Sequence, residues 1–321
     1  MNIKKYIIEK SKELNMDMIG FTDSGPLVNI EEYLDYRLKN NRFTEFEEAD
    51  IKKRIDPKLT MGNCKTIIVI ALSYNVDYNE KPDCEFKGSL SKSSWGTDYH
   101  RVLKNRLELL ADEIKKVKDF DYKSFVDTGP LVDRELAYKA GIGYYGKNCS
   151  IINEKYGSFI FIGYMLTDLE IDECDKPMDS QCGDCNLCLK ACPTNALDNS
   201  YRLNPRKCIS YLTQTKKEID VELRKKMGIK IYGCDTCQMV CPKNKNIKKS
   251  SHEEFIPTVT KGYLDLKELL TISNREFKQK YGHISGSWRG KSVLRRNAIN
   301  ALKNIKTSAN EKSINKLIDD K

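Results

Sequence analysis

Residues 181–197 read QCGDCNLCLKACPTNAL, and the cysteines in this stretch decide how the middle of the chain folds. Gaps of two, two and three residues separate four cysteines, and a proline follows the last: Cys182, Cys185, Cys188, Cys192 and Pro193. A reducing compartment keeps such thiols from pairing as disulfides, so the spacing is typical of a metal centre. We therefore expect residues 171–250 to form a domain built around metal rather than around a large apolar core.

The spacing C-x2-C-x2-C-x3-C-P is that of bacterial ferredoxins, and its end recurs at Cys234, Cys237, Cys241 and Pro242. The isolated Cys208 supplies an eighth thiolate, and eight thiolates bind two [4Fe–4S] clusters. In two-cluster ferredoxins the last cysteine of each run binds the other cluster. The predicted ligand sets are therefore Cys182, Cys185, Cys188 and Cys241 for cluster 1, and Cys192, Cys208, Cys234 and Cys237 for cluster 2.

Structural zinc is the alternative metal. Zinc sites usually close with four ligands in two pairs, not with triplets that end in Cys-Pro, so the spacing favours iron and sulfide. The remaining thiols are expected to be buried or unreactive, and no role is assigned to them: Cys64, Cys84, Cys149 and Cys174.

The whole chain has 321 residues, enough for two or three domains with a sizeable core. Its longest apolar run, residues 66–76, is far shorter than the roughly 20 residues of a membrane-spanning helix, so no membrane contact is expected. The first residues have an amphipathic helix pattern without the apolar stretch of a signal peptide, which favours the cytoplasm.

Hydrophobic periodicity predicts an α/β (α+β) domain over residues 1–170. The expected helices span residues 2–14, 29–38, 99–117 and 133–140. The expected strands span residues 18–21, 66–73, 123–126, 149–153 and 158–166, with a turn at 154–157 joining the last two. Residues 251–321 are expected to form a small helical tail, with helices at 264–270, 274–280, 292–303 and 312–319.

The formal net charge is +9, and the excess is uneven. Residues 283–306 contain six Lys or Arg and no Asp or Glu, a pattern that suits a polyanion such as nucleic acid. A solvated, lysine-rich helical surface is the alternative.

A dinucleotide-binding pattern, GxGxxG, occurs at Gly141, Gly143 and Gly146. It follows a predicted helix and precedes a predicted strand, whereas a dinucleotide fingerprint follows a strand and opens a helix. We therefore expect a helix stop and a tight turn.

A second short motif, Asp98-Tyr99-His100, resembles the start of the Asp-x-His-x-x-Gly pattern by which some proteins donate a histidine to corrinoid cobalt. Leu103 stands where the glycine should be. Histidine ligation is therefore not expected at this motif, and His252 and His283 are the other histidines.

Longer segments resemble the epoxyqueuosine reductase family. They are FVDTGPLVDRELAYKAGIGYYGKN at 125–148, YGSFIFIG at 156–163, YGCDTCQMVCPKN at 232–244 and RRNAINALKN at 295–304, beside the cysteine runs. The resemblance implies a nitroreductase-like cobalamin-binding domain, related to the corrinoid domain of reductive dehalogenases, then a dicluster ferredoxin-like domain and a short HEAT-like tail. It implies an oxidoreductase of queuosine biosynthesis that reduces epoxyqueuosine to queuosine at the wobble position of tRNA.

The implied reaction consumes two electrons and two protons. Clusters pass one electron at a time, whereas the cobalt of cobalamin can be driven to Co(I), so cob(I)alamin is the implied reductant. The family's proton donor falls on Asp133, which needs a raised pKa to act as an acid at neutral pH. The alternative role for Asp133 is the N-cap of the helix that follows. We expect an external low-potential electron donor and a monomeric protein.

The resemblance also implies cobalamin contacts, each of which has an ordinary structural alternative such as a cap, a turn or a surface pair. They are Arg54, Ser94, Asp98, Asp133, Lys147, Asn148, Asn153, Ser158, Thr167, Ser210 and Tyr211. The candidate tRNA contacts are Arg289, Lys291, Arg295 and Arg296, with residues 243–249 as a second basic stretch. Trp288 is available for stacking on a base, although a place in the core of the tail is the expectation for it.

Two other functions fit parts of the sequence. A corrinoid iron–sulfur reductase of the reductive dehalogenase kind would use the same cofactors on a small molecule, but the basic tail and the lack of a twin-arginine signal count against it. A ferredoxin-type electron-transfer protein would not need a first domain of about 170 residues.

Overall fold

The apolar stretch TIIVIALS becomes β2 (Thr66–Ser73) in the computed structural model, which describes residues 2–319. β2 is a central strand of a four-stranded antiparallel sheet in the order β1 (Met18–Asp23), β2, β7 (Ile160–Thr167) and β4 (Tyr122–Phe125). Every residue of β2 is buried, because neighbouring elements cover both faces of the sheet.

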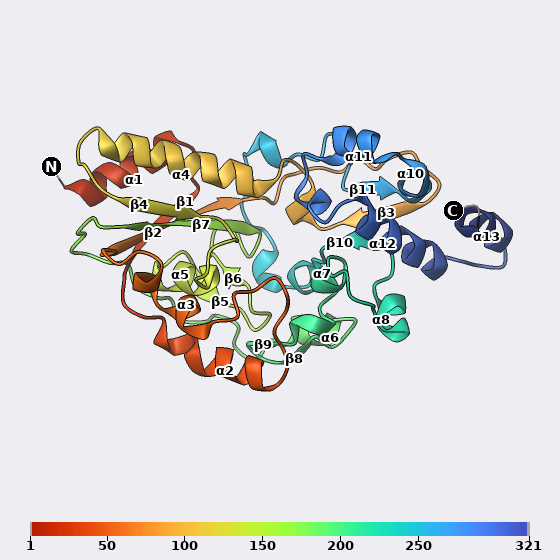
Figure 1. Cartoon of the computed structure of the whole chain (residues 1–321), viewed down its shortest axis with the longest axis horizontal. Coiled ribbons are helices and arrows are strands. Elements are labelled where there is room, and N and C mark those ends of the chain that lie inside the picture. The colour runs from red at the N-terminus through yellow and green to blue at the C-terminus, as the bar shows by residue number, and fades with distance from the viewer. Residues whose placement is uncertain (1, 320–321) are drawn as a thin grey trace.

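Alternate residues of β2 point into two separate cores. The even-numbered residues Ile68, Ile70 and Leu72 pack with α1 (Ile3–Glu13) and α4 (Tyr99–Lys115). The odd-numbered residues pack with α5 (Asp133–Lys139) on the other face. Figure 1 shows α1 and α4 above the sheet and α5 below it.

Below the sheet, α2 (Glu31–Lys39) and α3 (Ile51–Ile55) are joined by residues 40–50, which we call the bridging loop. The two helices pack on each other. The bridging loop therefore starts and ends on the side of the sheet where α5 lies (Figure 1).

A second sheet has three strands, with β3 (Lys87–Leu90) in the middle. β10 (Lys230–Tyr232) runs parallel to β3, and β11 (Tyr263–Asp265) runs antiparallel to it. The strands come from three distant parts of the chain, and their apolar side chains share one core with the helical tail. The tail consists of α10 (Leu266–Thr271), α11 (Asn274–Tyr281), α12 (Lys291–Asn304) and α13 (Glu311–Asp319).

The cysteine-rich region consists of short elements. Its helices are α6 (Leu187–Ala191), α7 (Ile209–Leu212), α8 (Val221–Lys226) and α9 (Thr236–Met239), and its hairpin is formed by β8 (Leu197–Asn199) and β9 (Arg202–Leu203). The 3-10 turns of the described chain are η1 (Val28–Ile30), η2 (Pro57–Leu59), η3 (Lys92–Ser94), η4 (Pro205–Lys207), η5 (Pro242–Asn244), η6 (Glu253–Phe255) and η7 (Ser285–Ser287).

A buried contact between His252 and Asp17 ties the segment before the tail to the first sheet. His252 Nε2 lies 2.8 Å from Asp17 Oδ2, and the two side chains are 4% and 9% exposed. Ser250 adds a bond from its hydroxyl to the carbonyl of Ser73, at the end of β2. The two halves of the molecule therefore share buried polar contacts as well as strands.

Most expected elements are confirmed, and three differences have clear causes. Residues 149–153 and 158–166 do not form a hairpin, because β6 (Ile151–Ile152) pairs with β5 (Tyr144–Tyr145) while β7 pairs with β2 and β4. β3 was not expected, since its strand partners are remote in sequence. The helix expected at 264–270 begins only at Leu266, because β11 takes the residues before it.

Candidate active site and cluster region

A cavity of about 1040 Å³ lies beside α5. It is at the upper end of the roughly 300–1,000 Å³ usual for ligand pockets, so it has room for a large ligand. The first domain, the cysteine-rich region and the tail all contribute to its walls, which include Tyr33, Arg37, Glu47, Arg54, Tyr99, Asp127, Asp133, Arg134, Tyr201, Ser210, Gln214 and Ser285.

Asp133 is the first residue of α5 and lines this cavity. The alternative role, as N-cap of this helix, is not the one the structure shows: Val132 is the N-cap, and no side chain caps the helix. Asp133 Oδ2 instead accepts a hydrogen bond of 3.0 Å from the backbone N–H of Asp127, a residue with φ of +59°. The carboxyl is thus held by the loop before the helix and stays open to the cavity.

The pKa of Asp133 is raised to about 7, mainly by burial and next by the negative charge of Asp127. Arg134 and the N–H of Asp127 act in the opposite direction. Asp133 is partly exposed because it faces the cavity. Protein atoms surround the carboxyl on its other sides and keep water away from it. At neutral pH, about half of such carboxyls carry a proton.

Asp127 is held in turn by the Asp98-Tyr99-His100 motif. Its Oδ2 accepts a 2.8 Å hydrogen bond from the Tyr99 hydroxyl and lies 3.6 Å from His100 Nε2. His100 Nδ1 lies 2.7 Å from Asp98 Oδ1, and Asp98 caps α4. Burial lowers the pKa of His100, but its bonds to Asp127 and Asp98 outweigh this and raise it to about 9. The imidazole is therefore cationic, and each of its two ring nitrogens faces a carboxylate oxygen.

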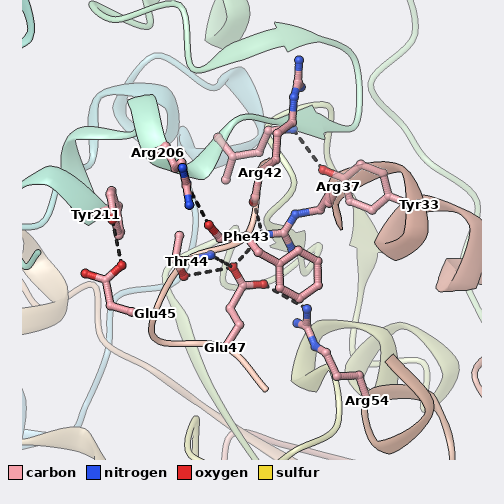
Figure 2. Close-up of polar contacts among 11 residues, drawn as sticks. Tyr33, Arg37, Arg42, Phe43, Thr44, Glu45, Glu47, Arg54, Arg206 and Tyr211 are labelled. Atoms are coloured by element: carbon pink, nitrogen blue, oxygen red, sulfur yellow. Dashed lines mark hydrogen bonds and ion pairs between the residues drawn. The ribbon is translucent and has the colours of Figure 1, made fainter. Parts of the chain in front are cut away.

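The bridging loop brings a carboxylate into the cavity between two guanidinium groups. Glu47 accepts hydrogen bonds from Arg37 at 2.7 Å and from Arg54 at 2.9 Å, as Figure 2 shows. The hydroxyl of Thr44 adds a third bond, at 2.9 Å. Arg134 also lines the cavity and donates to the carbonyl of Cys149. Two guanidinium groups thus pair with this carboxylate, and the guanidinium groups of Arg134 and Arg202 line the same cavity.

The other end of the bridging loop contacts the cysteine-rich region. Glu45 accepts a bond from the hydroxyl of Tyr211, and Arg206 donates to the carbonyl of Phe43 (Figure 2). The hydroxyl of Thr215 also donates to Glu45. Burial raises the pKa of Glu45. The two hydroxyls, a backbone hydrogen bond and the charge of Lys217 outweigh this effect and lower the pKa to about 2. The loop therefore connects the first domain to the segment that follows Cys208.

Four of the cysteines surround a second, much smaller cavity of about 30 Å³. They are Cys182, Cys185, Cys188 and Cys241, the predicted ligands of cluster 1. The other lining residues include Lys147, Asn148 and Lys243, and none of the ten lines the large cavity. The first three ligands thus lie with the distant Cys241 rather than with their sequence neighbour Cys192.

The predicted ligands of cluster 2 also lie near one another. Burial raises the pKa of Cys237, and the thiols of Cys208, Cys234, Cys188 and Cys192 add to this effect, so Cys188 of cluster 1 is also close. Cys208 precedes α7, whose Ser210 lines the large cavity, so this group of thiols is the one beside that cavity. Within residues 2–319, no three His, Cys, Asp or Glu side chains converge as ligands of a single metal ion do.

Three of the residues expected to bind cobalamin line the large cavity: Arg54, Asp133 and Ser210. The others have different surroundings. Ser94 and Asp98 bond within their own segments and to residues 283–286, Lys147 and Asn148 lie by the small cavity, and Asn153 closes its own turn. Ser158 bonds to Gln238 and Asn244, Thr167 to the carbonyl of Thr66, and Tyr211 to Glu45.

The residues expected to bind tRNA are partly engaged in the fold. Arg296 donates to the carbonyls of Thr215 and Leu212, and Lys291 donates to that of Ile272. Arg289 stacks on Trp288, and Arg295 is half-buried on α12. The expectation that Trp288 fills the core of the tail is wrong: it is 53% exposed and packs edge-on against Phe46.

The glycine motif forms the expected stop and turn. Gly141 follows the end of α5 with φ of +66°, and a Cβ at Gly143 would lie 2.4 Å from the carbonyl oxygen of Ile152. The close approach is thus to the chain itself.

The thiols without an assigned role are free; Cys64 and Cys149 are buried, and Cys84 and Cys174 are half-buried.

Several cavity residues were not found from the sequence. Tyr33, Arg37 and Glu47 belong to a segment without a motif, and only the fold brings them together. Arg134 and Asp127 lie within the segment at 125–148, so their closeness to Asp133 in sequence was a usable signal.

Among residues 2–319, none of the helices has both the length and the apolar character needed to cross a membrane.

Comparison with known proteins gives two family matches. A model described as "4Fe-4S double cluster binding domain" matches residues 181–244, and one described as "Epoxyqueuosine reductase QueG, DUF1730" matches residues 54–128. A protein of Bacillus cereus named epoxyqueuosine reductase is 45% identical over 311 residues, which are 96% of this chain and 82% of that protein.

Solved structures agree closely with the fold. An epoxyqueuosine reductase with an epoxyqueuosine-modified tRNA-Tyr stem loop has a TM-score of 0.92 at 44% identity, covering 96% of this chain and 82% of that one. The Bacillus subtilis enzyme, with its catalytic aspartate loop swung out of the active site, has a TM-score of 0.91 at 42% identity, covering 98% and 85%.

Proposed function

The chain belongs to the epoxyqueuosine reductase family, and we propose that it reduces epoxyqueuosine to queuosine at the wobble position of tRNA in the cavity that holds Asp133. The reaction takes two electrons and two protons, removes the epoxide oxygen as water and leaves an alkene. The observation that carries the proposal is a carboxyl with a pKa of about 7, placed in a large cavity beside the predicted cluster region.

The cavity suits cobalamin in size and in charge. Its volume admits a large ligand, and beside the carboxylates of Glu47, Glu48 and Asp127 it is lined by the guanidinium groups of Arg37, Arg54, Arg134 and Arg202. Cobalamin carries an anionic phosphodiester, which such groups would hold. When bound, it supplies a cobalt centre that can take up two electrons and use them together on one carbon of the substrate.

Asp133 is the proposed proton donor to the epoxide oxygen. The N–H of Asp127 occupies Oδ2, so the acidic proton is best placed on Oδ1, on the free side of the carboxyl. The proton makes the oxygen a much better leaving group, since an alkoxide departs poorly. Asp127 therefore has two roles toward Asp133: its N–H orients the carboxyl, and its charge helps to keep the acid protonated.

The cysteines are proposed to hold two [4Fe–4S] clusters with the crossed ligand sets given above. Thiolates are the ligands that such clusters use. Cluster 2, with Cys208, is on the side of the large cavity, and cluster 1 is the more distant centre. Electrons are therefore proposed to enter at cluster 1 and to leave from cluster 2.

We further propose that an external low-potential protein supplies the electrons and that the chain works as a monomer in the cytoplasm. The many free thiols support a compartment that keeps thiols reduced. A small-molecule reductase and a simple electron carrier are less well supported, because one solved relative is described with a modified tRNA stem loop and because the cavity holds an acid.

The test is turnover with the natural kind of substrate. Protein with both clusters reconstituted is incubated with cobalamin, a strong reductant and tRNA that carries epoxyqueuosine, and the nucleosides are then analysed by mass spectrometry. Queuosine is expected only when cobalamin is present. Formation of queuosine without cobalamin would overturn the mechanism, and failure with tRNA but turnover of a small epoxide or halide would favour the other reductase.

A further inference from the structure

We propose that the exposed face of α6 and α9 is the docking site for an acidic one-electron carrier protein that reduces cluster 1. The inference rests on the proposed function, in which the clusters pass electrons to the cavity. It names the surface of this chain that the carrier touches, with Leu187 and Met239 at its centre and Lys190, Lys243 and Lys245 at its edge.

The face belongs to helices next to the thiols of cluster 1. α6 contains Cys188, and α9 ends two residues before Cys241, although α9 also contains Cys237 of cluster 2. The two helices pack on each other. Electron transfer slows steeply with distance, so a carrier must dock where a cluster comes close to the surface, and the four cluster 1 thiols are partly exposed.

Two large apolar side chains are exposed here without a partner in the described chain. Leu187 is 49% exposed and Met239 is 59% exposed, and they belong to the two short helices that pack on each other. Met is enriched and acidic residues are depleted at the centre of protein interfaces. An apolar centre of this size suits a weak, transient encounter, which electron-transfer partners form with small interfaces.

Exposed lysines surround this apolar centre. Lys190 lies one turn after Leu187 on the same side of α6, and Lys243 follows Cys241 and donates to Gln181 Oε1 at 3.2 Å. Residues 236–252 include four exposed lysines, Lys243, Lys245, Lys248 and Lys249, and no Asp or Glu. Asp184 is the exposed acidic residue within the first cysteine run, so the balance stays positive.

The combination favours a protein over RNA as the occupant. Lysines alone would suit phosphates, but an exposed leucine and methionine between them offer RNA nothing to stack on, because base stacking uses aromatic or guanidinium planes. The modified nucleotide must also reach the large cavity, and none of the residues that line the cluster 1 cavity lines that one.

Each encounter moves one electron. The carrier is oxidised by one electron and cluster 1 is reduced by one, after which the carrier leaves. Two encounters supply the two electrons that, with two protons, convert the epoxide to an alkene and water. A transient complex therefore serves the reaction better than a tight one, and lysines at the rim accelerate its formation.

The test uses cluster-loaded full-length protein without tRNA or cobalamin, so that its outcome does not depend on epoxide reduction. A reduced acidic flavodoxin is the probe carrier, and bleaching of the cluster absorbance in a stopped-flow instrument gives the rate. The affinity of the oxidised flavodoxin is measured separately by calorimetry. The variant is the double charge reversal Lys190→Glu with Lys243→Glu, and the matched control is Lys5→Glu with Lys12→Glu, on exposed positions of α1.

In the Lys190→Glu, Lys243→Glu protein, the second-order rate with flavodoxin and its affinity should fall at least about tenfold at low salt. The loss should shrink in about 0.5 M salt, where the Debye length is only a few ångströms. Reduced methyl viologen, a small cation that needs no docking surface, should reduce the clusters as fast as before. The α1 control should behave like the unchanged protein.

Unchanged flavodoxin rate and affinity in the double variant would overturn the proposal. A fall in tRNA affinity with an unchanged flavodoxin rate would identify the surface as an RNA contact instead. If iron or sulfide is lost from the first variant, Lys190→Glu with Lys245→Glu keeps the Lys243 bond to Gln181 and gives the same decision.

Discussion

Asp127→Asn tests whether the charge of this residue sets the acidity of Asp133. The substitution removes the negative charge but keeps the backbone N–H that bonds to Asp133 Oδ2 at 3.0 Å. Asparagine also tolerates the φ of +59° found at position 127. The change therefore isolates the electrostatic effect on the neighbouring carboxyl.

The expected effect follows from the pKa of Asp133, which is raised to about 7 by burial and by Asp127. Removing one nearby like charge lowers such a pKa by about one unit. The protonated fraction at pH 8 would then fall from about 9% to about 1%, whereas at pH 6 it would fall only from about 90% to about 50%. Because the donor must be protonated, activity should drop about tenfold at pH 8 and about twofold at pH 6.

The assay is single-turnover reduction of an epoxyqueuosine stem loop by the fully loaded protein between pH 5.5 and 9. The ratio of variant to unchanged protein removes any pH effect that both share. The exposed Asp112→Asn on α4 is the control. It should not change the alkaline limb of the pH–rate profile, which is the pH range in which activity falls as Asp133 loses its proton. An alkaline limb that stays put in Asp127→Asn, or that moves to higher pH, would refute the electrostatic role.

Three further outcomes are expected. Asp133→Asn should lower kcat by about 10²–10⁴-fold with normal iron, sulfide and cobalamin contents, and full activity would remove this residue from the mechanism. Cys241→Ala should alter the same electron paramagnetic resonance signal as Cys185→Ala, and a match with Cys237→Ala would contradict the crossed ligand sets. Asp17→Asn removes the carboxylate of the buried contact with His252 and should lower the free energy of unfolding in urea by about 2 kcal/mol at pH 7. Burial raises the pKa of Asp17, but the bond to His252 and other hydrogen bonds lower it overall. The loss of stability in the variant should therefore shrink as the pH falls below about 4, where the Asp17 carboxylate takes up a proton. A loss that grows there would contradict this sign.

The elements that the sequence predicts well are those whose signal is local. The apolar run of β2, the periodicity of α4 and the glycine after α5 each carry their own pattern, and all three are confirmed. β3 reads KGSL and has no such pattern, because it is a strand only through partners that lie far away in the chain.

The residues of the candidate site likewise fall into those with a local sequence signal and those that only the fold brings together. Asp133 was found through a segment that resembles a family, but its exact place, one residue after the N-cap, depends on the loop that holds it. Arg37, Glu47 and Arg54 meet through packing of α2, the bridging loop and α3, so neither composition nor spacing could reveal the cluster. The placement of Trp288 likewise involves an edge-on contact with Phe46, which lies far away in the sequence.

The three-stranded sheet sets an order of events during translation. β3 leaves the ribosome long before β10 and β11 are made, so its backbone has no sheet partner while the cysteine-rich region is still emerging. β10 ends two residues before Cys234, which places closure of the sheet next to insertion of iron. In cells short of iron, the newly made chain would keep an unpaired strand for longer, and proteases and chaperones would compete for it.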